Sequence, residues 1–215
     1  MAGPECCSNP PIINTSCGSD SAENYGGLNA YVTGSPNAKH AILLASDVFG
    51  RVSASGFCVV IPDFFHGDPF VYDNNRPLAV WLKDRGTDKG FEDAKSVIDA
   101  LIRKGFSAIG AAGFCWGAKV VTELANSEFI QAAVLLHPSF TTVDDIEGVK
   151  SPIAILGAEI DNYSPPELVK KFEDILKAKP EVDSHVKIFP KVAHGWVLRY
   201  DADDEAAAKS SENQY

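Results

Sequence analysis

Short apolar runs alternate along this chain with segments of helical periodicity, and this alternation limits the possible folds more than any other feature. The runs are four or five residues long, which is typical of strands buried on both faces and too short for buried helices. The segment 91–104 has apolar residues at helical spacing, and Gly105 is typical of the residue that ends a helix. We therefore predict an α/β fold with a mostly parallel sheet covered on both faces. The predicted strands are residues 41–45, 58–61, 108–112, 132–136, 152–156 and 186–189.

Chain length and local composition predict one domain preceded by a short arm. The chain has 215 residues, which is enough for one sizeable core. We expect residues 1–24, rich in Pro, Ser, Asn and Cys, to form an irregular arm, and residues 25–215 to form a single domain. Ser164, two prolines and Glu167 predict a capped helix start.

One connection is shorter than this fold normally requires. Only residues 47–56 separate the strand that ends near Ser46 from the strand that begins near Phe57. A parallel crossover needs about a dozen residues or more, usually including a helix. Either these two strands are not parallel neighbours, or the chain lacks a crossover helix near residue 50.

Charge and composition exclude several classes of function. The net charge is -10, and Lys and Arg form no run, so we expect no nucleic-acid partner. No apolar run reaches the roughly 18 residues of a membrane span, and the first residues do not resemble a signal peptide. An odd number of cysteines, five, fits a cytoplasmic protein better than a disulfide framework. Cys6, Cys7 and Cys17 have no companion cluster at zinc spacing, so we expect no metal.

The sequence Gly-Phe-Cys-Trp-Gly at residues 113–117 lies between a predicted strand and a predicted helix. This context is typical of a nucleophile elbow, in which a sharp turn excludes side chains from the flanking positions. The turn would raise Cys115 above the sheet at a helix N-terminus, which favours a thiolate. The backbone N–H of Trp116 would point at a developing oxyanion. A glycine-rich turn around an inert cysteine is the alternative.

Chain order selects the partners of this cysteine. Of the five histidines, His66, His137 and His194 follow predicted strands and could lie at the carboxyl edge of the sheet. In enzymes whose nucleophile lies on such an elbow, the three catalytic residues follow one another along the chain in the order nucleophile, acid, base. Cys115, Asp161 and His194 satisfy that order, whereas His66 precedes the nucleophile and His137 precedes the acid.

Four stretches together resemble the dienelactone hydrolase family, and more narrowly its plant members. The similarity covers nearly the whole chain from about residue 26 to residue 200. It implies an α/β-hydrolase fold and a Cys–His–Asp triad that hydrolyses small esters or lactones through an acyl-enzyme. It implies no cofactor, a small-molecule substrate, and a monomer or weak dimer. The stretches are residues 46–50 (Ser-Asp-Val-Phe-Gly), 113–119 (Gly-Phe-Cys-Trp-Gly-Ala-Lys), 156–161 (Leu-Gly-Ala-Glu-Ile-Asp) and 193–196 (Ala-His-Gly-Trp).

The resemblance also implies roles for residues outside the triad. Asp47 occupies the place of a carboxylate that holds the resting thiol, although a loop carboxylate without that role is an equal alternative. The N–H of Val48 would be the second oxyanion donor. His66 lies in the region where bacterial members instead carry an arginine that binds the substrate carboxylate, so the resemblance does not extend to an anionic-lactone pocket. Arg199 lies near the place of a second family arginine, one residue out of step. With Trp196, these two are candidate substrate-binding residues, and the substrate class stays open.

Two other functions are kept as alternatives. The short connection and the early end of the chain fit a shortened, catalytically impaired isoform that serves as a binding protein, and we expect lower stability than in full-length relatives. Some plant relatives are named β-glucanases, but glycoside hydrolysis needs two carboxylates that flank a sugar. Glu159 and Asp161 are near each other in sequence, yet nothing places them on opposite sides of a cleft.

Overall fold

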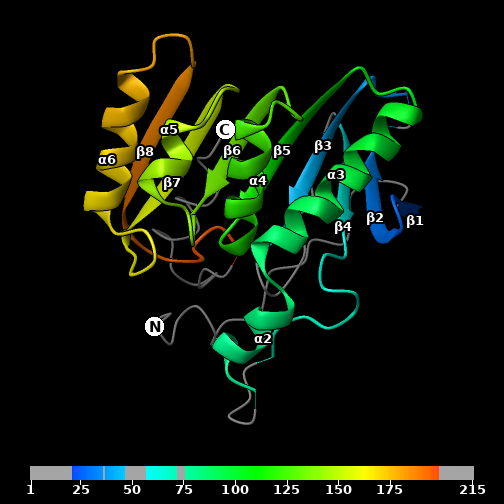
Figure 1. Ribbon diagram of the computed structural model, residues 1–215, viewed down its shortest axis with the longest axis horizontal. Coiled ribbons are helices and arrows are strands. Elements are labelled where there is room, and N and C mark those ends of the chain that lie inside the picture. The colour runs from blue at the N-terminus through cyan, green and yellow to red at the C-terminus, as the bar shows by residue number, and fades with distance from the viewer. Residues whose placement is uncertain (1–20, 36, 47–56, 72–75, 199–215) are drawn as a thin grey trace.

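The computed structural model describes residues 21–35, 37–46, 57–71 and 76–198, and these form a single eight-stranded sheet with helices packed on it (Figure 1). The spatial order of the strands is β1-β2-β4-β3-β5-β6-β7-β8. The strands are β1 (Ser21–Tyr25), β2 (Leu28–Gly34), β3 (His40–Ala45), β4 (Cys58–Pro62), β5 (Ala108–Phe114), β6 (Ala132–Leu136), β7 (Ile153–Ile160) and β8 (Ser184–Ala193).

The sheet is mostly parallel, as the alternation predicts. β1 pairs with β2 and β2 with β4 in antiparallel fashion, and all the other neighbours are parallel. The carboxyl ends of β5, β6, β7 and β8 therefore meet at one edge. This arrangement is the α/β-hydrolase fold that the sequence predicts.

The strands on either side of the short connection are parallel neighbours. Ala41 of β3 lies opposite Cys58 of β4, and the pairing continues to Leu43 and Val60. Of the two alternatives, the one in which these strands are not parallel neighbours is therefore wrong. The predicted lack of a crossover helix concerns residues 47–56, which lie outside the described residues.

The longer helices form where apolar residues recur on one face. In α3 the fully buried residues Ala94, Val97, Ile98 and Leu101 share a face, and the helix ends just before Gly105, whose φ is +96°. A left-handed backbone of this kind favours glycine and closes the last turn. In Figure 1, α3, α4, α5 and α6 lie in front of the sheet. The described helices are α2 (Leu78–Asp84), α3 (Thr87–Arg103), α4 (Trp116–Asn126), α5 (Val143–Glu147) and α6 (Pro166–Lys177).

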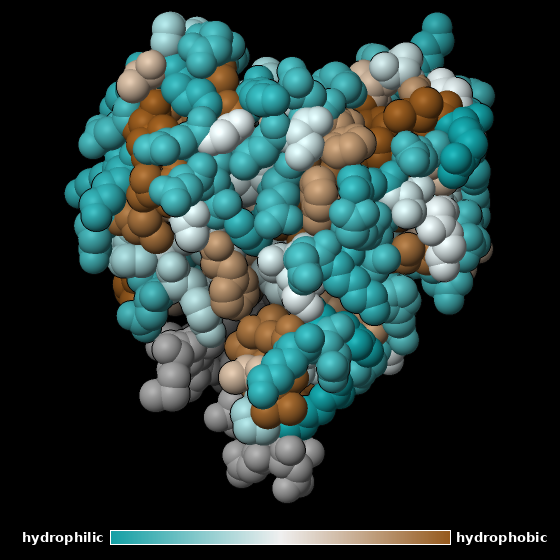
Figure 2. All heavy atoms as spheres, in the orientation of Figure 1, coloured by the Kyte–Doolittle hydropathy of each residue, from teal (hydrophilic) through white to brown (hydrophobic). Residues whose placement is uncertain are grey.

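Two buried clusters hold the layers together. The larger includes Leu43, Leu101 and Phe172 and lies between the sheet and these helices. The smaller includes Phe114 and Phe189 and takes in the carboxyl ends of several strands. On the face seen in Figure 2, hydrophilic side chains predominate and hydrophobic ones form smaller patches, as expected where amphipathic helices cover a core.

Several predicted boundaries need correction. β1 begins at Ser21, so the last four residues of the predicted irregular arm belong to the sheet. β5 and β7 continue to Phe114 and Ile160, which brings each strand up to a predicted site residue. The predicted cap of α6 is wrong, because Pro165 is the N-cap and makes no side-chain cap hydrogen bond. None of the described helices is both long and apolar enough to cross a bilayer.

Candidate active site

Cys115 is the single residue that connects β5 to α4, and its backbone has a conformation that few non-glycine residues adopt. Its φ is 50° and its ψ is -110°. Such a conformation is strained for a non-glycine residue and persists only where the surroundings fix it. Three hydrogen bonds do so here: Cys115 N donates to Leu136 O at 3.2 Å, and Cys115 O accepts from Ala118 N at 3.2 Å and from Ser139 N at 3.0 Å. The sharp turn between strand and helix that the sequence predicts is therefore present at Cys115.

The glycines on either side of Cys115 are required by close backbone approach. A Cβ on Gly117 would overlap the carbonyl oxygen of Ala45 in β3. A Cβ on Gly113 would overlap the carbonyl oxygen of Gly117. Because both obstacles are backbone atoms, neither can move aside without shifting a strand or the helix.

We expect Gly117→Ala to lower the free energy of unfolding by about 1–3 kcal/mol or more, because an added methyl in a closed site forces backbone shifts. Urea denaturation measures this. The matched control is Gly110→Ala, in the middle of β5, where the nearest atom to a new Cβ is Ala132 O at 3.6 Å, an ordinary contact. Equal destabilisation by the two substitutions would contradict this account of the elbow.

Asp161 and His194 form a buried pair at the ends of β7 and β8. His194 follows β8 directly, and its backbone N donates to Ile160 O at 3.0 Å, which ties the two strand ends together. Asp161 Oδ2 lies 2.7 Å from His194 Nδ1. Asp161 Oδ1 accepts from the backbone N–H groups of Tyr163 at 2.8 Å and Ser164 at 3.2 Å. Both carboxylate oxygens of Asp161 are thus hydrogen-bonded, one to the backbone and one to the imidazole.

The charge of this site favours an imidazolium. Burial alone would lower the pKa of His194, but the negative charge of Cys115 and the hydrogen bond with Asp161 raise it from 6.5 to about 10. His194 Nε2 is buried and has no hydrogen-bond partner among the described residues. Cys115 is thus close enough to act on the charge of His194, and its sulfur also lies within hydrogen-bond distance of a second residue. That residue is Ser139, whose Oγ lies 3.3 Å from Cys115 Sγ.

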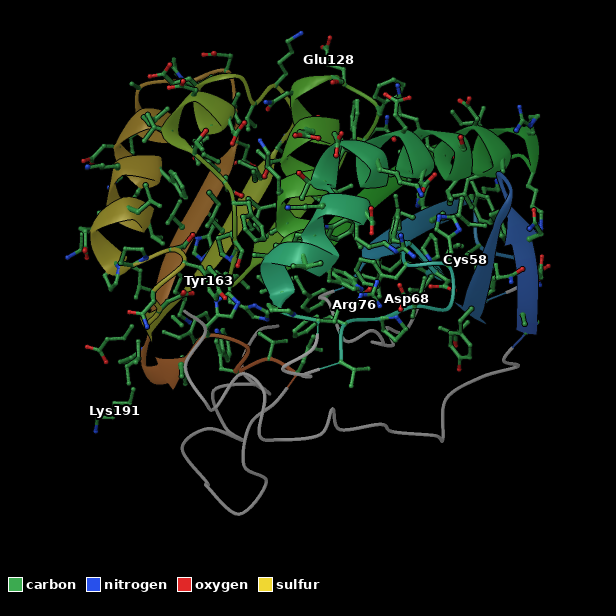
Figure 3. All side chains as sticks on the ribbon, turned by 60° about the horizontal axis from the view of Figure 1, so that its bottom comes forward. Cys58, Asp68, Arg76, Glu128, Tyr163 and Lys191 are labelled. Carbon is green, nitrogen blue, oxygen red and sulfur yellow. The ribbon has the colours of Figure 1, made fainter. Side chains whose placement is uncertain are left out.

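Two rings enclose the imidazole of His194. The His137 ring stands edge-to-face to it, with centroids 4.8 Å apart and planes at 72°. The Tyr163 ring lies 5.0 Å away and in turn contacts the exposed ring of Phe140 at 6.3 Å. Figure 3 shows Tyr163 at the edge of the sheet where β7 and β8 finish.

Sequence reasoning missed Ser139 and Tyr163, and it set His137 aside. All three lie just beyond the carboxyl ends of β6 and β7, at the same edge of the sheet as Cys115, Asp161 and His194. The sequence does carry one indication of these residues, because they follow closely after predicted strands. The order of residues along the chain excluded His137 as the base, but it says nothing about which side chains surround the base.

The other predicted site residues have different surroundings. Asp47, Val48 and Arg199 lie outside the described residues. His66 is exposed, and its Nε2 lies 3.3 Å from Asp93 Oδ2 on α3.

Both predicted site tryptophans are buried. Trp196 packs on Phe189, with ring centroids 4.3 Å apart. The ring of Trp116 donates through Nε1 to Arg85 O at 2.9 Å and packs on Phe65. Trp116 is also the first residue of α4, and amides at this position have no acceptor within their helix. Its N–H therefore meets the first requirement of an oxyanion donor.

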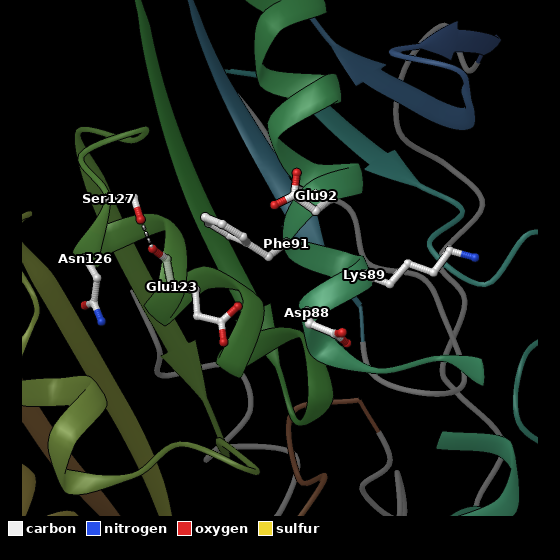
Figure 4. Close-up of a pocket in the computed structure, with 7 residues that line it drawn as sticks. All are labelled: Asp88, Lys89, Phe91, Glu92, Glu123, Asn126 and Ser127. Carbon is white, nitrogen blue, oxygen red and sulfur yellow. Dashed lines mark hydrogen bonds between the residues drawn. The ribbon is translucent and has the colours of Figure 1, made fainter. Parts of the chain in front are cut away.

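A cavity of about 570 Å³ opens between α3 and α4 (Figure 4). None of its described lining residues belongs to the predicted site, so the cavity gives no support to an alternative catalytic centre. Within the described ranges, no group of three or more His, Cys, Asp or Glu side chains is placed to hold a metal ion. The lining residues are Asp88, Lys89, Phe91, Glu92, Glu123, Asn126 and Ser127.

The sequence of this chain is similar to those of known proteins. Residues 28–215 match the Dienelactone hydrolase family. An Endo-1,3;1,4-beta-D-glucanase of Zea mays is 39% identical over 168 residues, and the match takes in 73% of this chain. The match covers 54% of the maize protein, so the chain spans about half of that relative. A Carboxymethylenebutenolidase homolog of Homo sapiens is 30% identical over 212 residues, and 86% of each chain is covered.

A solved structure supports the fold. A dienelactone hydrolase-like promiscuous phosphotriesterase from metagenomic libraries superposes with a TM-score of 0.70 at 20% identity, covering 91% of this chain and 95% of that one. At this identity the likeness concerns the fold alone, whereas the sequence match over residues 28–215 establishes the family. The chain is therefore a member of the dienelactone hydrolase family, a hydrolase with the α/β-hydrolase fold.

Proposed function

We propose that this protein hydrolyses small carboxylic esters or lactones through an acyl-enzyme on Cys115, with His194 as acid and base and Asp161 as its orienting carboxylate. One observation carries the proposal: the elbow presents Cys115 beside a buried His194–Asp161 pair joined at 2.7 Å, and Cys115 acts on the charge of that histidine. A nucleophile, a base and a group that orients the base are the elements of covalent acyl transfer.

In the first half of the reaction the thiolate of Cys115 attacks the carbonyl carbon, and the carbonyl electrons move to oxygen. The N–H of Trp116 donates to that oxyanion, and Val48 is the predicted second donor. When the tetrahedral intermediate collapses, the carbon–oxygen bond to the alcohol breaks. The departing oxygen takes the proton of His194, which the high pKa of this residue keeps in place at neutral pH.

In the second half a water molecule attacks the thioester carbon, and His194 accepts the proton that the water loses. Asp161 keeps the proton of the imidazole ring on Nδ1, so that Nε2 is free to accept, and stabilises the resulting imidazolium. Collapse of the second intermediate releases the acid and restores the thiolate. With a lactone, the alcohol stays attached and the product is a hydroxy acid. The residues themselves supply each step, so the proposal needs no cofactor.

The two alternatives have less support. The glucanase activity in the name of the maize relative would require two carboxylates free to flank a sugar. Here Asp161 is held by His194, and Glu159 Oε2 accepts from Lys191 N at 2.6 Å. An impaired isoform would have no need of an ordered Asp161–His194 pair beside a strained cysteine, because strain of this kind costs stability.

The proposal predicts a covalent acetyl-enzyme. We expect wild-type protein that is mixed with p-nitrophenyl acetate and quenched in acid to carry one acetyl group, which peptide mass spectrometry places on Cys115. Acetylation of Cys115 is the expected result because the thioester forms before water attacks. Cys58, a free cysteine buried in β4, is the internal control and should stay unmodified. Ester turnover with the acetyl group on another residue would contradict the proposal.

A further inference from the structure

We propose that the segment after β6 is a third part of this active site, with Ser139 as the hydrogen-bond donor to the Cys115 sulfur and His137 as the positioning residue for His194. This inference rests on the proposed function, because it assigns roles relative to that nucleophile and that base. It adds two residues that the Cys–His–Asp triad does not include.

The contact of Ser139 with the nucleophile is built from both its backbone and its side chain. Its N–H donates to Cys115 O at 3.0 Å, and its hydroxyl oxygen lies 3.3 Å from Cys115 Sγ. Ser139 is fully buried. A thiolate has no proton to give, so in the charged state of the site the hydroxyl must be the donor. A buried donor aimed at an anion favours the charged form, because there is little water to compete with it.

Comparison with two other buried hydroxyl groups, those of Ser151 and Thr122, sets Ser139 apart. Ser151 Oγ donates to Ile130 O at 2.8 Å, and Thr122 Oγ1 donates to Ala118 O at 2.8 Å. Both satisfy backbone carbonyl groups, as most buried side-chain hydroxyls do. Ser139 instead contacts the sulfur of the elbow cysteine, the atom that would react.

His137 makes the corresponding contact with the base. It is fully buried, and its ring packs edge-to-face with that of His194, with centroids 4.8 Å apart. The Phe114 ring lies 6.1 Å from the His137 ring. The bond to Asp161 fixes one nitrogen of His194 but leaves the imidazole free to swing about that point. A ring in edge-to-face contact with the imidazole restricts this freedom, since aromatic pairs have preferred geometries.

The backbone of the segment is strained at its ends. His137 has a φ of 38° and Phe140 a φ of 62°, and Cys115, to which the segment is bonded, has a φ of 50°. Left-handed conformations of bulky residues are unfavourable, and they concentrate at functional sites where neighbouring contacts enforce them. The strain thus falls on the residues that carry Ser139 to the nucleophile and His137 to the base.

The test of Ser139 follows alkylation of Cys115 by iodoacetamide from about pH 5 to about pH 9, a reaction of the thiolate that needs no ester turnover. We expect Ser139→Ala to move the midpoint of this profile up by about one pH unit and to slow alkylation near pH 6 about tenfold, with recovery at high pH. Ser139→Thr, which keeps the hydroxyl, should restore most of the rate. Ser151→Ala is the matched loss of a buried hydroxyl and should follow the wild-type profile. A Ser139→Ala profile that superimposes on the wild type would overturn the role of Ser139.

The test of His137 compares a ring with an aliphatic side chain. We expect His137→Leu to lower kcat about tenfold with little change in KM, and His137→Phe, which keeps a ring, to retain most of kcat. Equal kcat values for wild type and His137→Leu, with both proteins folded, would overturn the role of His137.

A negative result for Ser139 or for His137 can be distinguished from failure of the proposed function. If ester hydrolysis survives Cys115→Ala, the acyl-enzyme proposal is wrong, whereas the alkylation profile still reports on Ser139 alone.

Discussion

Cys115→Ala is expected to lower kcat for p-nitrophenyl acetate by a factor of at least about 10⁴ in a protein that remains folded. Loss of the nucleophile removes the acyl-enzyme route, and only binding and oxyanion stabilisation are left. Cys115→Ser should also be severely impaired, because a hydroxyl is far harder to ionise than a thiol and the proposed mechanism begins with a thiolate. Steady-state rates measured after a check of cooperative unfolding give the answer.

Cys58 provides the matched control for this experiment. It is the other free cysteine among the described residues, and burial raises the pKa of its thiol. A thiol of this kind is a poor nucleophile, so Cys58→Ala should keep kcat and change mainly stability. Hydrolysis that persists in Cys115→Ala and is lost in Cys58→Ala would show that the wrong cysteine has been assigned.

The same variant separates the esterase from the glucanase alternative. If the protein releases sugar from a mixed-linkage β-glucan and Cys115→Ala releases it equally well, the chemistry belongs to carboxylates and not to the triad. If neither protein releases sugar while only the wild type hydrolyses the ester, the glucanase name of the maize relative does not extend to this chain.

Local pattern was sufficient to predict most of this fold. Buried strands such as β6 have no polar face, so their apolar runs end where the strands end, and the predicted bounds 132–136 are those observed. The elbow was also predictable, because Gly113 and Gly117 answer a steric demand made by their own neighbours in sequence and by β3.

What the sequence could not show depends on contacts across the sheet. Ser139 meets Cys115 because β6 lies beside β5, and His137 meets His194 because β7 and β8 follow in order beyond β6. No periodicity carries that information. The cap of α6 was misjudged because the helix begins at Pro166, so that Pro165 is the N-cap and Ser164 lies one residue before it; the backbone N–H of Ser164 donates to Asp161 Oδ1.

Asp161→Asn is expected to lower kcat/KM by about 10³ to 10⁴ with little change in shape, because an amide differs from a carboxylate by one atom. The oxygen of Asn can still accept from Tyr163 N and Ser164 N, as Asp161 Oδ1 does now. The amide NH₂ then faces His194 Nδ1, so the ring must place its proton on Nε2. In that tautomer Nε2 has no lone pair with which to accept a proton from water, and deacylation stops.

The same substitution changes how stability depends on pH. The pKa of His194 is raised from 6.5 to about 10 in the folded protein, so this group stabilises the fold fully below pH 6.5 and loses its effect as the pH rises through about 10. Removal of the carboxylate takes away one cause of the raised pKa. We therefore expect Asp161→Asn to be less stable than wild type mainly below pH 6.5, and the difference to shrink toward pH 10. Urea denaturation across this range, with the His194 ring titrated by NMR, measures both effects.

The exposed pair of His66 and Asp93 supplies the control for this last prediction. It has the same two residue types at 3.3 Å, but both side chains have access to solvent. Water screens such a pair, so Asp93→Asn should leave kcat/KM at the wild-type level and change stability by less than about 1 kcal/mol. If Asp93→Asn and Asp161→Asn reduce activity equally, the effect comes from general loss of negative charge and not from the orientation of His194. If only Asp161→Asn reduces it, and the pKa of His194 falls in that variant, the buried carboxylate acts through the imidazole as the geometry requires.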